Sequence, residues 1–154
     1  LKGLELKWPN DILYLGKKFG GILLENRQQK ASNQVVIGIG LNNYLSKRRR
    51  EKITQPCTDL KTILNKTPKR NCLAGLIINE LFSALALFEK EGFSPFLRTW
   101  YQFDRLLNHR VIIDSHKKLM KGIVLGIDNQ GALMLKNEEG KVHCISSGTV
   151  VEIL

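Results

Sequence analysis

The sequence predicts an α+β protein, in which a mixed β-sheet with packed helices precedes a small β-barrel. Three observations predict this fold. The first 43 residues form short β-prone runs separated by turn residues. Residues 68–103 repeat apolar side chains every three to four positions, and residues 111–154 return to a period of two. Because strands and helices form separate blocks, the order is not that of a doubly wound parallel sheet.

The first block is expected to form a sheet. Its predicted strands are residues 4–8, 12–15, 19–25 and 35–43. A tight turn at 16–18 and a polar turn at 26–33 connect the later strands. Gly38 and Gly40 fall on one face of the last strand, because successive side chains in a strand alternate. Either a ligand or another packed element, such as a helix, approaches that bare face.

The helical block follows an irregular, charged segment at 44–68, in which one short helix is expected near Leu60–Leu64. Thr67 and Pro68 predict the start of a long helix, and Gly92 predicts its end. Its apolar stripe, at a spacing of three to four residues, comprises Leu73, Leu76, Ile77, Leu81, Leu85 and Phe88. Ser94 is expected to cap a second helix, with Pro95 in its first turn. The inward residues of that helix are expected to be Phe96, Leu97, Trp100 and Phe103.

Five short strands with glycine-bearing turns then predict a small barrel. The predicted strands are residues 111–114, 123–128, 132–136, 141–146 and 150–154. We place the domain boundary so that residues 1–107 form the first domain and residues 108–154 form the second.

Composition narrows the class of protein. Three cysteines without a C-x-x-C pair and three scattered histidines disfavour a disulfide framework and a zinc site. We expect a cytoplasmic protein without a membrane span, since no apolar run approaches about 18 residues. The net charge of +10 includes the run Lys47–Arg50 and Lys52. Such a run is usually solvated, but it also suits an acidic protein or a phosphate-bearing ligand. No aromatic-interleaved face or helix-turn-helix pattern accompanies it, so we expect no nucleic-acid partner.

Polar residues and glycines gather at the ends of the first strands. They are Lys7, Asn10, Asp11, Lys18, Gly20, Gly21, Gly38, Gly40, Asn42 and Asn43. In one sheet they offer ammonium groups for phosphate, a carboxylate and amides, and bare backbone for a flat ligand. Taken alone, Pro9-Asn10-Asp11 is equally a plain type I turn. The pair Gly38 and Gly40 lacks the third glycine of a dinucleotide fingerprint.

Together these motifs resemble the catalytic domain of bacterial biotin–protein ligases. The resemblance is carried by KWPND at Lys7–Asp11, by Lys18 seven residues later, by GILLE from Gly21, and by IGIGLN at Ile37–Asn42. It continues through LALFEKEGFSPFLRTWYQFD and through the C-terminal stretch GIVLGIDNQGALMLKNEEGKVHCISSGTV. It leaves out the basic loop at 44–60. The fold that the resemblance implies is class II synthetase-like, followed by an SH3-like barrel.

The resemblance implies a two-step reaction. Biotin and MgATP give biotinyl-5′-adenylate, and the biotinyl group passes to a lysine of a biotin carrier protein domain. Lys18 would be catalytic, bridging the biotin carboxylate and the α-phosphate. Lys7 and Asn10 would hold the phosphates, and Asp11 or Asn42 would lie near Mg²⁺. Gly20, Gly21, Gly38 and Gly40 would let substrates lie against the backbone, whereas Trp8 is expected in the core.

Some of the family's motifs do not occur in this sequence. A Ser-Thr pair, a biotin-reading Gln and a G-R-G-R-x-G loop would precede KWPND, and an arginine would follow Ser147-Gly148. We therefore expect a piece of a biotin–protein ligase that is incomplete or inactive alone. The alternatives are a degenerate relative that acts as a binding module and a lipoate–protein ligase-like acyltransferase. The oligomeric state is left open, a homodimer included.

Overall fold

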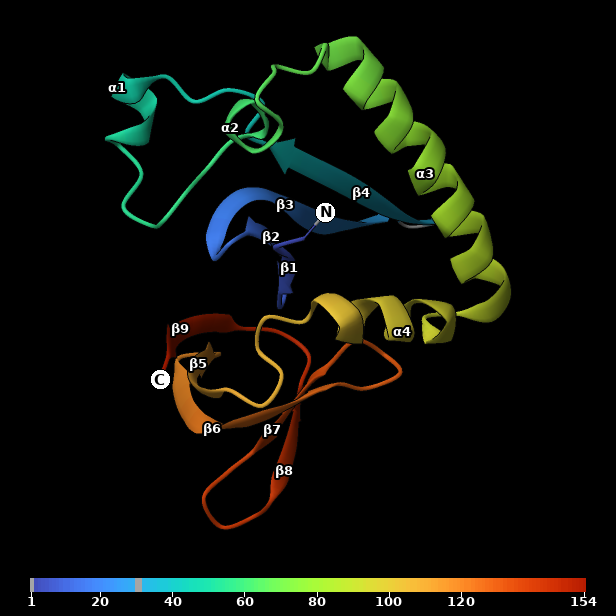
Figure 1. The fold of residues 1–154 in the computed structure, drawn as a ribbon. Helices are drawn as coiled ribbons and strands as arrows, with labels where there is room; N and C mark the ends of the chain where they lie inside the picture. Colours follow the sequence, from blue (N-terminus) through green and yellow to red (C-terminus); the bar gives the residue numbers. More distant parts are fainter. Residues whose placement is uncertain (1, 30–31) are drawn as a thin grey trace. The chain divides into compact units, whose positions relative to one another are not determined.

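The chain forms two compact units in the computed structural model, which describes residues 2–29 and 32–154 (Figure 1). The first unit extends to Glu5 and continues over residues 10–74. The second contains residues 6–9 and 75–154. The KWPND stretch is therefore divided between the units after Pro9. The predicted boundary at 107/108 stays a prediction.

Four strands form the sheet of the N-terminal part, in the order β1-β2-β3-β4. They are β1 (Leu4–Lys7), β2 (Asp11–Tyr14), β3 (Lys17–Gln29) and β4 (Ser32–Leu41). The prediction of a polar turn at 26–33 was wrong, because Asn26 pairs with Val35 and the ladder continues to Gln29 and Ser32. Residues 30–31 of that expected turn lie outside the described residues. Pairing with β4 thus extends β3 through a run whose composition favours a turn.

A β-bulge interrupts the ladder between β2 and β3. Ile12 pairs with Gly20, but the next residue, Leu13, pairs with Lys18. Phe19 is therefore an extra residue, and its side chain is buried. Bulges re-aim the neighbouring side chains, and this one lies directly beside Lys18.

The charged segment after β4 contains two short helices, α1 (Lys47–Arg50) and α2 (Leu60–Leu64). The second was predicted and the first was not. Asp59 begins α2 by accepting a 2.7 Å hydrogen bond from the backbone N–H of Thr62. An acidic residue at this position satisfies a backbone donor that the helix itself leaves unpaired.

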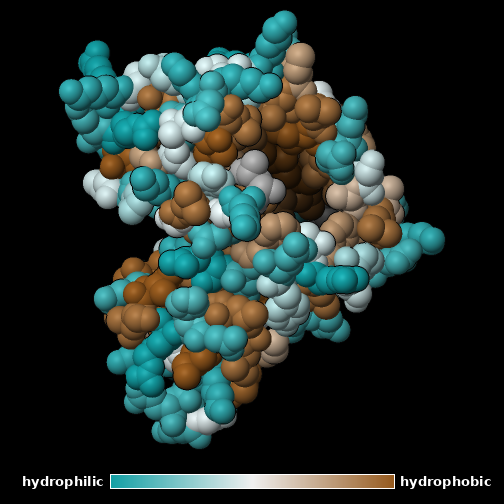
Figure 2. Space-filling view, viewed as in Figure 1, coloured by the Kyte–Doolittle hydropathy of each residue, from teal (hydrophilic) through white to brown (hydrophobic). Residues whose placement is uncertain are grey.

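The long helix α3 (Arg70–Glu91) is followed by Gly92, whose φ of 68° ends it as predicted. Its apolar stripe is not part of the core, because none of the residues of α3 is buried and Leu76 is 64% exposed. Figure 2 shows hydrophobic side chains at the surface over this helix. Residues 71–88 carry a single charge, Glu80, so α3 is long and apolar enough to cross a membrane by length and composition alone. The expectation that no apolar run approaches the length of a membrane span was wrong, although core helices of soluble proteins meet the same criteria.

The second long helix, α4 (Ser94–Phe103), begins one residue earlier than expected. Phe93 occupies the cap position and makes no side-chain capping bond, so the prediction of Ser94 as the cap was wrong. Leu97 and Trp100 pack against the hydrophobic core of the second unit, as predicted. Tyr101 also joins this helix to the barrel strands, because its hydroxyl donates a 2.6 Å hydrogen bond to the carbonyl of Ile127.

Five strands form the second sheet, in the order β8-β7-β6-β5-β9. They are β5 (Arg110–Ser115), β6 (Lys118–Ile127), β7 (Leu133–Lys136), β8 (Val142–Ile145) and β9 (Thr149–Ile153). The five predicted strands are confirmed, although β6 begins at Lys118 and not at the predicted Ile123. Alternate side chains of these strands point inward. Val111, Ile113, Val124, Leu133 and Leu135 are each 0% exposed. The register of the sheet shifts between Ile112 and Ile113 and between Val124 and Gly126, as at β-bulges, and this sheet forms the expected barrel-like domain.

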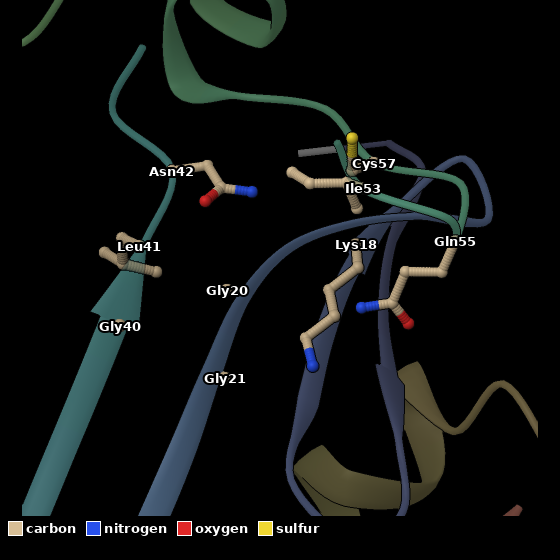
Figure 3. Close-up of a pocket in the computed structure, with 9 residues that line it drawn as sticks. All are labelled: Lys18, Gly20, Gly21, Gly40, Leu41, Asn42, Ile53, Gln55 and Cys57. Atoms are coloured by element: carbon tan, nitrogen blue, oxygen red, sulfur yellow. The ribbon is translucent and has the colours of Figure 1, made fainter. Parts of the chain in front are cut away.

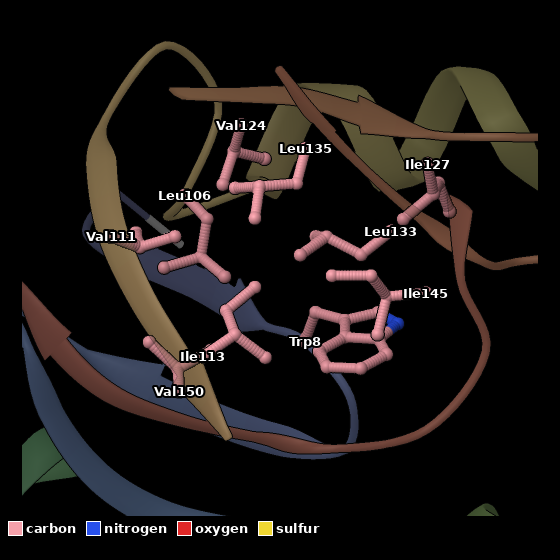
Figure 4. Close-up of a cluster of buried hydrophobic side chains, with 10 residues drawn as sticks. All are labelled: Trp8, Leu106, Val111, Ile113, Val124, Ile127, Leu133, Leu135, Ile145 and Val150. Atoms are coloured by element: carbon pink, nitrogen blue, oxygen red, sulfur yellow. The ribbon is translucent and has the colours of Figure 1, made fainter. Parts of the chain in front are cut away.

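Trp8 completes the core of the second unit from the far end of the chain (Figure 4). Its side chain is 4% exposed, and its Nε1 donates a 3.2 Å hydrogen bond to the carbonyl of Gly131. The prediction that Trp8 is a core residue is confirmed. The peptide bond between Trp8 and Pro9 is cis.

Candidate functional site

A hollow of about 450 Å³ opens in the first unit, where β3 and β4 meet the segment between α1 and α2 (Figure 3). Its lining residues are Lys18, Gly20, Gly21, Gly40, Leu41, Asn42, Ile53, Gln55 and Cys57. Five of these are predicted site residues, which the sheet register brings together. Gly21 pairs directly with Gly40, so bare backbone of two strands forms part of the wall.

The charged side chain at this hollow is Lys18, whose ammonium group forms an ion pair with Asp11. Both side chains are partly buried, at 31% and 18% exposed. Gly21 leaves the space in which this ion pair forms. A methyl group there would lie 3.5 Å from Cε of Lys18, 3.7 Å from Oδ1 of Asp11 and only 3.3 Å from the Asn10 carbonyl oxygen. The absence of a side chain at Gly21 therefore lets Lys18 cross the strand to Asp11.

A second, shallower surface continues from the hollow along β3 and β4. It is lined by Asn10, Lys18, Gly21, Ile22, Leu23, Gly38, Ile39 and Gly40. A methyl group on Gly38 would meet only Leu23, at 3.6 Å, and one on Gly40 would meet only the Gly21 carbonyl, at 3.9 Å. Neither contact forbids a side chain. Among the residues that the structure describes, no helix atom lies within 4 Å of an added methyl group at either glycine. Gly20 differs, because a methyl group there would collide with Leu41.

The wall opposite the glycines comes from residues 53–57, which the sequence analysis did not assign to the site. The backbone N–H of Lys18 donates to the carbonyl of Pro56 at 2.9 Å, and its carbonyl accepts from Thr58 at 2.9 Å. Cys57 thereby forms a parallel bridge with Lys18. The motifs gave no signal for this wall, because the segment lies in the loop outside the resemblance.

Asp59 anchors the same segment at its C-terminal end. Its side chain is 1% exposed, and it accepts hydrogen bonds from the backbone N–H groups of Leu45 and Thr62 and from the Arg50 guanidinium, at 2.7–2.9 Å. Burial acts to raise the pKa of Asp59, but the hydrogen bonds from Thr62 and Leu45 and the charge of Arg50 hold the pKa below the usual 3.8. The carboxylate therefore stays ionised and holds α1 and α2 together.

The remaining predicted site residues have different positions. Asn42 lies at the hollow, but its side-chain N–H donates to the carbonyl of Thr58 at 3.1 Å, so its side-chain oxygen is the group left to meet a ligand. Asn10 has an exposed side chain on the shallower surface. Lys7 ends β1, belongs to the second unit and does not line the hollow.

The donor set at the hollow suits phosphate better than a directly bound metal. None of the described residues that line the hollow or the shallower surface carries a carboxylate. The predicted site residue Asp11 lines neither, and its carboxylate is already paired with Lys18. Nor does the described part of the chain contain a group of three or more His, Cys, Asp or Glu side chains placed to hold a metal ion. Mg²⁺ commonly binds through one or two carboxylates together with substrate phosphates and water, so an ion carried by a nucleotide fits these residues.

Comparison with known proteins agrees with this architecture. Residues 3–42 match the family described as Biotin/lipoate A/B protein ligase family, and residues 106–151 match Biotin protein ligase C terminal domain. The apo structure of biotin protein ligase from Aquifex aeolicus has the same fold, with a TM-score of 0.82, 24% identity, and coverage of 96% of this chain and 64% of that chain. The structure of that ligase in complex with biotin and ATP gives a TM-score of 0.77 at 22% identity, with coverage of 96% and 61%.

The first match and the fold place the chain in the class of biotin and lipoate protein ligases. The second match, to a domain of biotin ligases alone, narrows that class. The chain belongs to the biotin protein ligase family.

Curated relatives support this assignment. The bifunctional ligase/repressor BirA of Salmonella typhimurium is 38% identical over 136 residues, which are 88% of this chain and 42% of that protein. The biotin–[acetyl-CoA-carboxylase] ligase of Mycobacterium tuberculosis is 32% identical over 150 residues, with coverage of 96% and 53%. The chain thus spans about half the length of these relatives.

Proposed function

We propose that this chain forms part of a biotin–protein ligase and supplies the wall of its site that binds the activating phosphate. The overall reaction is the ATP-dependent conversion of biotin to biotinyl-5′-AMP, followed by transfer of the biotinyl group to a lysine of a carrier protein domain. The observation that carries the proposal is the position of the Lys18 ammonium beside a floor of bare backbone at Gly21 and Gly40.

The first step brings two anions together, because a carboxylate oxygen attacks the α-phosphorus and pyrophosphate leaves. A fixed cation at that point stabilises the negative charge that builds up on the phosphoryl oxygens. Lys18 is the cation in the right setting. Its backbone is held on one side by the bulge at Phe19 and on the other by Pro56 and Thr58.

Asp11 has a positioning role in this proposal. It holds the Lys18 ammonium in place before substrates bind, and it balances the charge of a lysine that is two-thirds buried. The substrate carboxylate and phosphate then share the ammonium with Asp11. Asn10 lies on the adjoining surface, where its amide suits a phosphate oxygen, and the side-chain oxygen of Asn42 suits a donor of the nucleotide or an Mg²⁺-bound water.

The glycines provide shape rather than charge. A flat or extended ligand can lie against Gly38 and Gly40 because neither position carries a side chain and neither is covered by a neighbouring one. Biotin is favoured over lipoate as the acyl group, because the C-terminal match is to a domain described for biotin protein ligases.

Ligand binding tests the proposal without requiring turnover. Isothermal titration of the 154-residue chain with a non-hydrolysable biotinyl-5′-AMP analogue should give a saturable signal. Lys18→Ala should weaken binding by roughly a hundredfold, the scale of one lost charge-stabilising group. Lys17→Ala removes an exposed neighbouring lysine and serves as the matched control. Equal affinities for the two variants would remove Lys18 from this role.

Activity separates the remaining alternatives. Formation of biotinyl-5′-AMP from biotin and MgATP, followed by mass spectrometry, should be absent or very slow with this chain alone. Fast turnover by the chain alone would overturn the proposal that it is only part of the site. Failure to bind the analogue at all would favour the degenerate binding module.

A further inference from the structure

The basic run that the sequence analysis left unassigned forms a defined surface of the first unit. We call Lys47, Arg48, Arg49 and Lys52 the α1 basic surface. All four residues are exposed, and among the described residues no carboxylate pairs with any of them. Figure 2 shows hydrophilic side chains over α1.

The charge of the protein is concentrated in the unit that carries this surface. The first unit has fourteen Lys and Arg residues against five Asp and Glu residues, a formal charge of +9 out of the total +10. The second unit has ten against nine, a charge of +1. A field of one sign over one unit steers a partner of the opposite sign toward that unit.

The α1 basic surface is anchored, unlike a freely solvated charge run. Arg50 contributes its charge inward, to the buried Asp59 at 2.9 Å, while Arg48 and Arg49 remain free to meet a partner. Asp59 also accepts from the backbone of Leu45, which precedes the helix. A side chain 1% exposed thus fixes both ends of a four-residue helix whose other charges face outward.

The same anchor fixes the surface relative to the hollow. Ile53 and Gln55 follow Lys52 directly and line the hollow beside Lys18. Pro56 and Thr58 are hydrogen-bonded to the backbone of Lys18, and Thr58 also accepts from Asn42. The α1 basic surface therefore stands at the rim of the hollow, within the same unit.

We propose that the α1 basic surface docks the acidic face of the carrier protein domain, next to the lysine that receives the acyl group. This proposal rests on the proposed function, because that function places the acyl group beside Lys18, which lines the hollow at this rim. A cationic lysine approaching a unit of charge +9 is repelled unless carboxylates accompany it. Carboxylates around the acceptor lysine, paired with Arg48 and Arg49, convert that repulsion into attraction.

A protein suits this surface better than a nucleic acid. Four helical residues extend only about 6 Å, too short to read a DNA groove. The aromatic residue nearest in sequence, Tyr44, has its ring face covered by the ammonium of Lys61 at 4.7 Å, so that face is not free to stack on a base.

Direct binding tests the proposal. The probes are a purified apo-carrier domain, the same domain with the carboxylates beside its acceptor lysine changed to amides, and a 20-base-pair DNA duplex. We expect Arg48→Glu/Arg49→Glu to weaken binding of the carrier roughly tenfold and to reduce its salt dependence, as loss of complementary rim charges does. The matched control, Lys118→Glu/Lys121→Glu, changes the net charge equally on exposed residues of the second unit and should leave the affinity within about twofold. The amide form of the carrier should be insensitive to the arginine changes.

Three outcomes would overturn the proposal. They are a carrier that does not bind, equal weakening by both double variants, and a DNA duplex that binds more tightly than the carrier through Arg48 and Arg49. Circular dichroism checks whether the Arg48→Glu/Arg49→Glu variant keeps its fold. We expect it to do so, because the Arg50–Asp59 pair is unchanged. Lys18→Ala separates this proposal from the proposed function, because it should weaken analogue binding roughly a hundredfold while carrier binding persists.

Discussion

The indole of Trp8 donates a hydrogen bond to the carbonyl of Gly131, 123 residues further along the chain. Trp8 also packs among Leu106, Ile113 and Val150 in the core of the second unit. One residue of the KWPND stretch is therefore structural, and two of its neighbours, Asn10 and Asp11, belong to the unit with the hollow.

Replacement of Trp8 should destabilise the barrel. Trp8→Phe keeps most of the apolar contact but leaves the Gly131 carbonyl without its donor, at a cost of about 1 kcal/mol. Trp8→Ala also leaves a cavity and should cost about 3–5 kcal/mol. Urea unfolding, monitored by hydrogen exchange in β7, measures both. Equal stability of Trp8→Ala and the unmodified chain would contradict a core role.

Gly21 and Gly38 should respond differently to the same added methyl group. Gly21→Ala crowds the Asn10 carbonyl at 3.3 Å and should displace the Lys18–Asp11 pair. Gly38→Ala meets only Leu23, at 3.6 Å, so it should keep the unfolding free energy within about 1 kcal/mol. Its methyl group nevertheless projects where we place the ligand, so analogue affinity should fall. Thermal melts and titrations of the two variants separate these effects, and unchanged affinity in Gly38→Ala would remove that glycine from the site.

Acid should destabilise the first unit through Asp59. The pKa of this carboxyl is lower in the folded protein than the usual 3.8, so its contribution is complete above pH 3.8 and is lost as the pH falls through the folded pKa. Asp59→Ala removes the helix cap and should lower the unfolding free energy by about 1–2 kcal/mol near neutral pH. Urea titrations between pH 2 and pH 7 should show this difference shrinking in acid. Glu51→Ala, at an exposed neighbouring position, is the control.

Asp104 should show the opposite pH dependence. Burial raises the pKa of this carboxyl, although the 2.9 Å hydrogen bond from the backbone N–H of Leu106 acts against the rise. The folded state is therefore favoured while Asp104 is protonated, and that contribution is lost as the pH rises from 3.8 through the folded pKa. Relative to Asp104→Asn, the unmodified chain should gain stability as the pH falls across this range. A difference that is constant with pH would contradict the raised pKa.

The spacing of apolar residues in the sequence was sufficient to predict buried positions where burial follows the period of a strand. Ile113 and Val124 are buried, and both alternate with outward-facing neighbours. Likewise, the motifs led us to group Lys18, Gly21 and Asn42, and these three residues line one hollow. Pattern failed for α3, because Leu76 and Phe88 have helical spacing but the described chain places no element over them. It also failed for the wall at Ile53–Cys57. That wall depends on the contact of Asp59 with Arg50 and on backbone bonds to Lys18, and no local period encodes either.

The bulge at Phe19 also sets how this strand can change in evolution. Along a strand, adding or removing one residue exchanges its two faces for the whole length that follows. Without Phe19 as an extra residue, the part of β3 beyond Gly20 would turn its other face toward the surface where we place the ligand. Gly21 would then no longer lie beside Lys18. Insertions elsewhere in β3 must therefore come in pairs, whereas the bulge is the one place where an odd count is already accommodated.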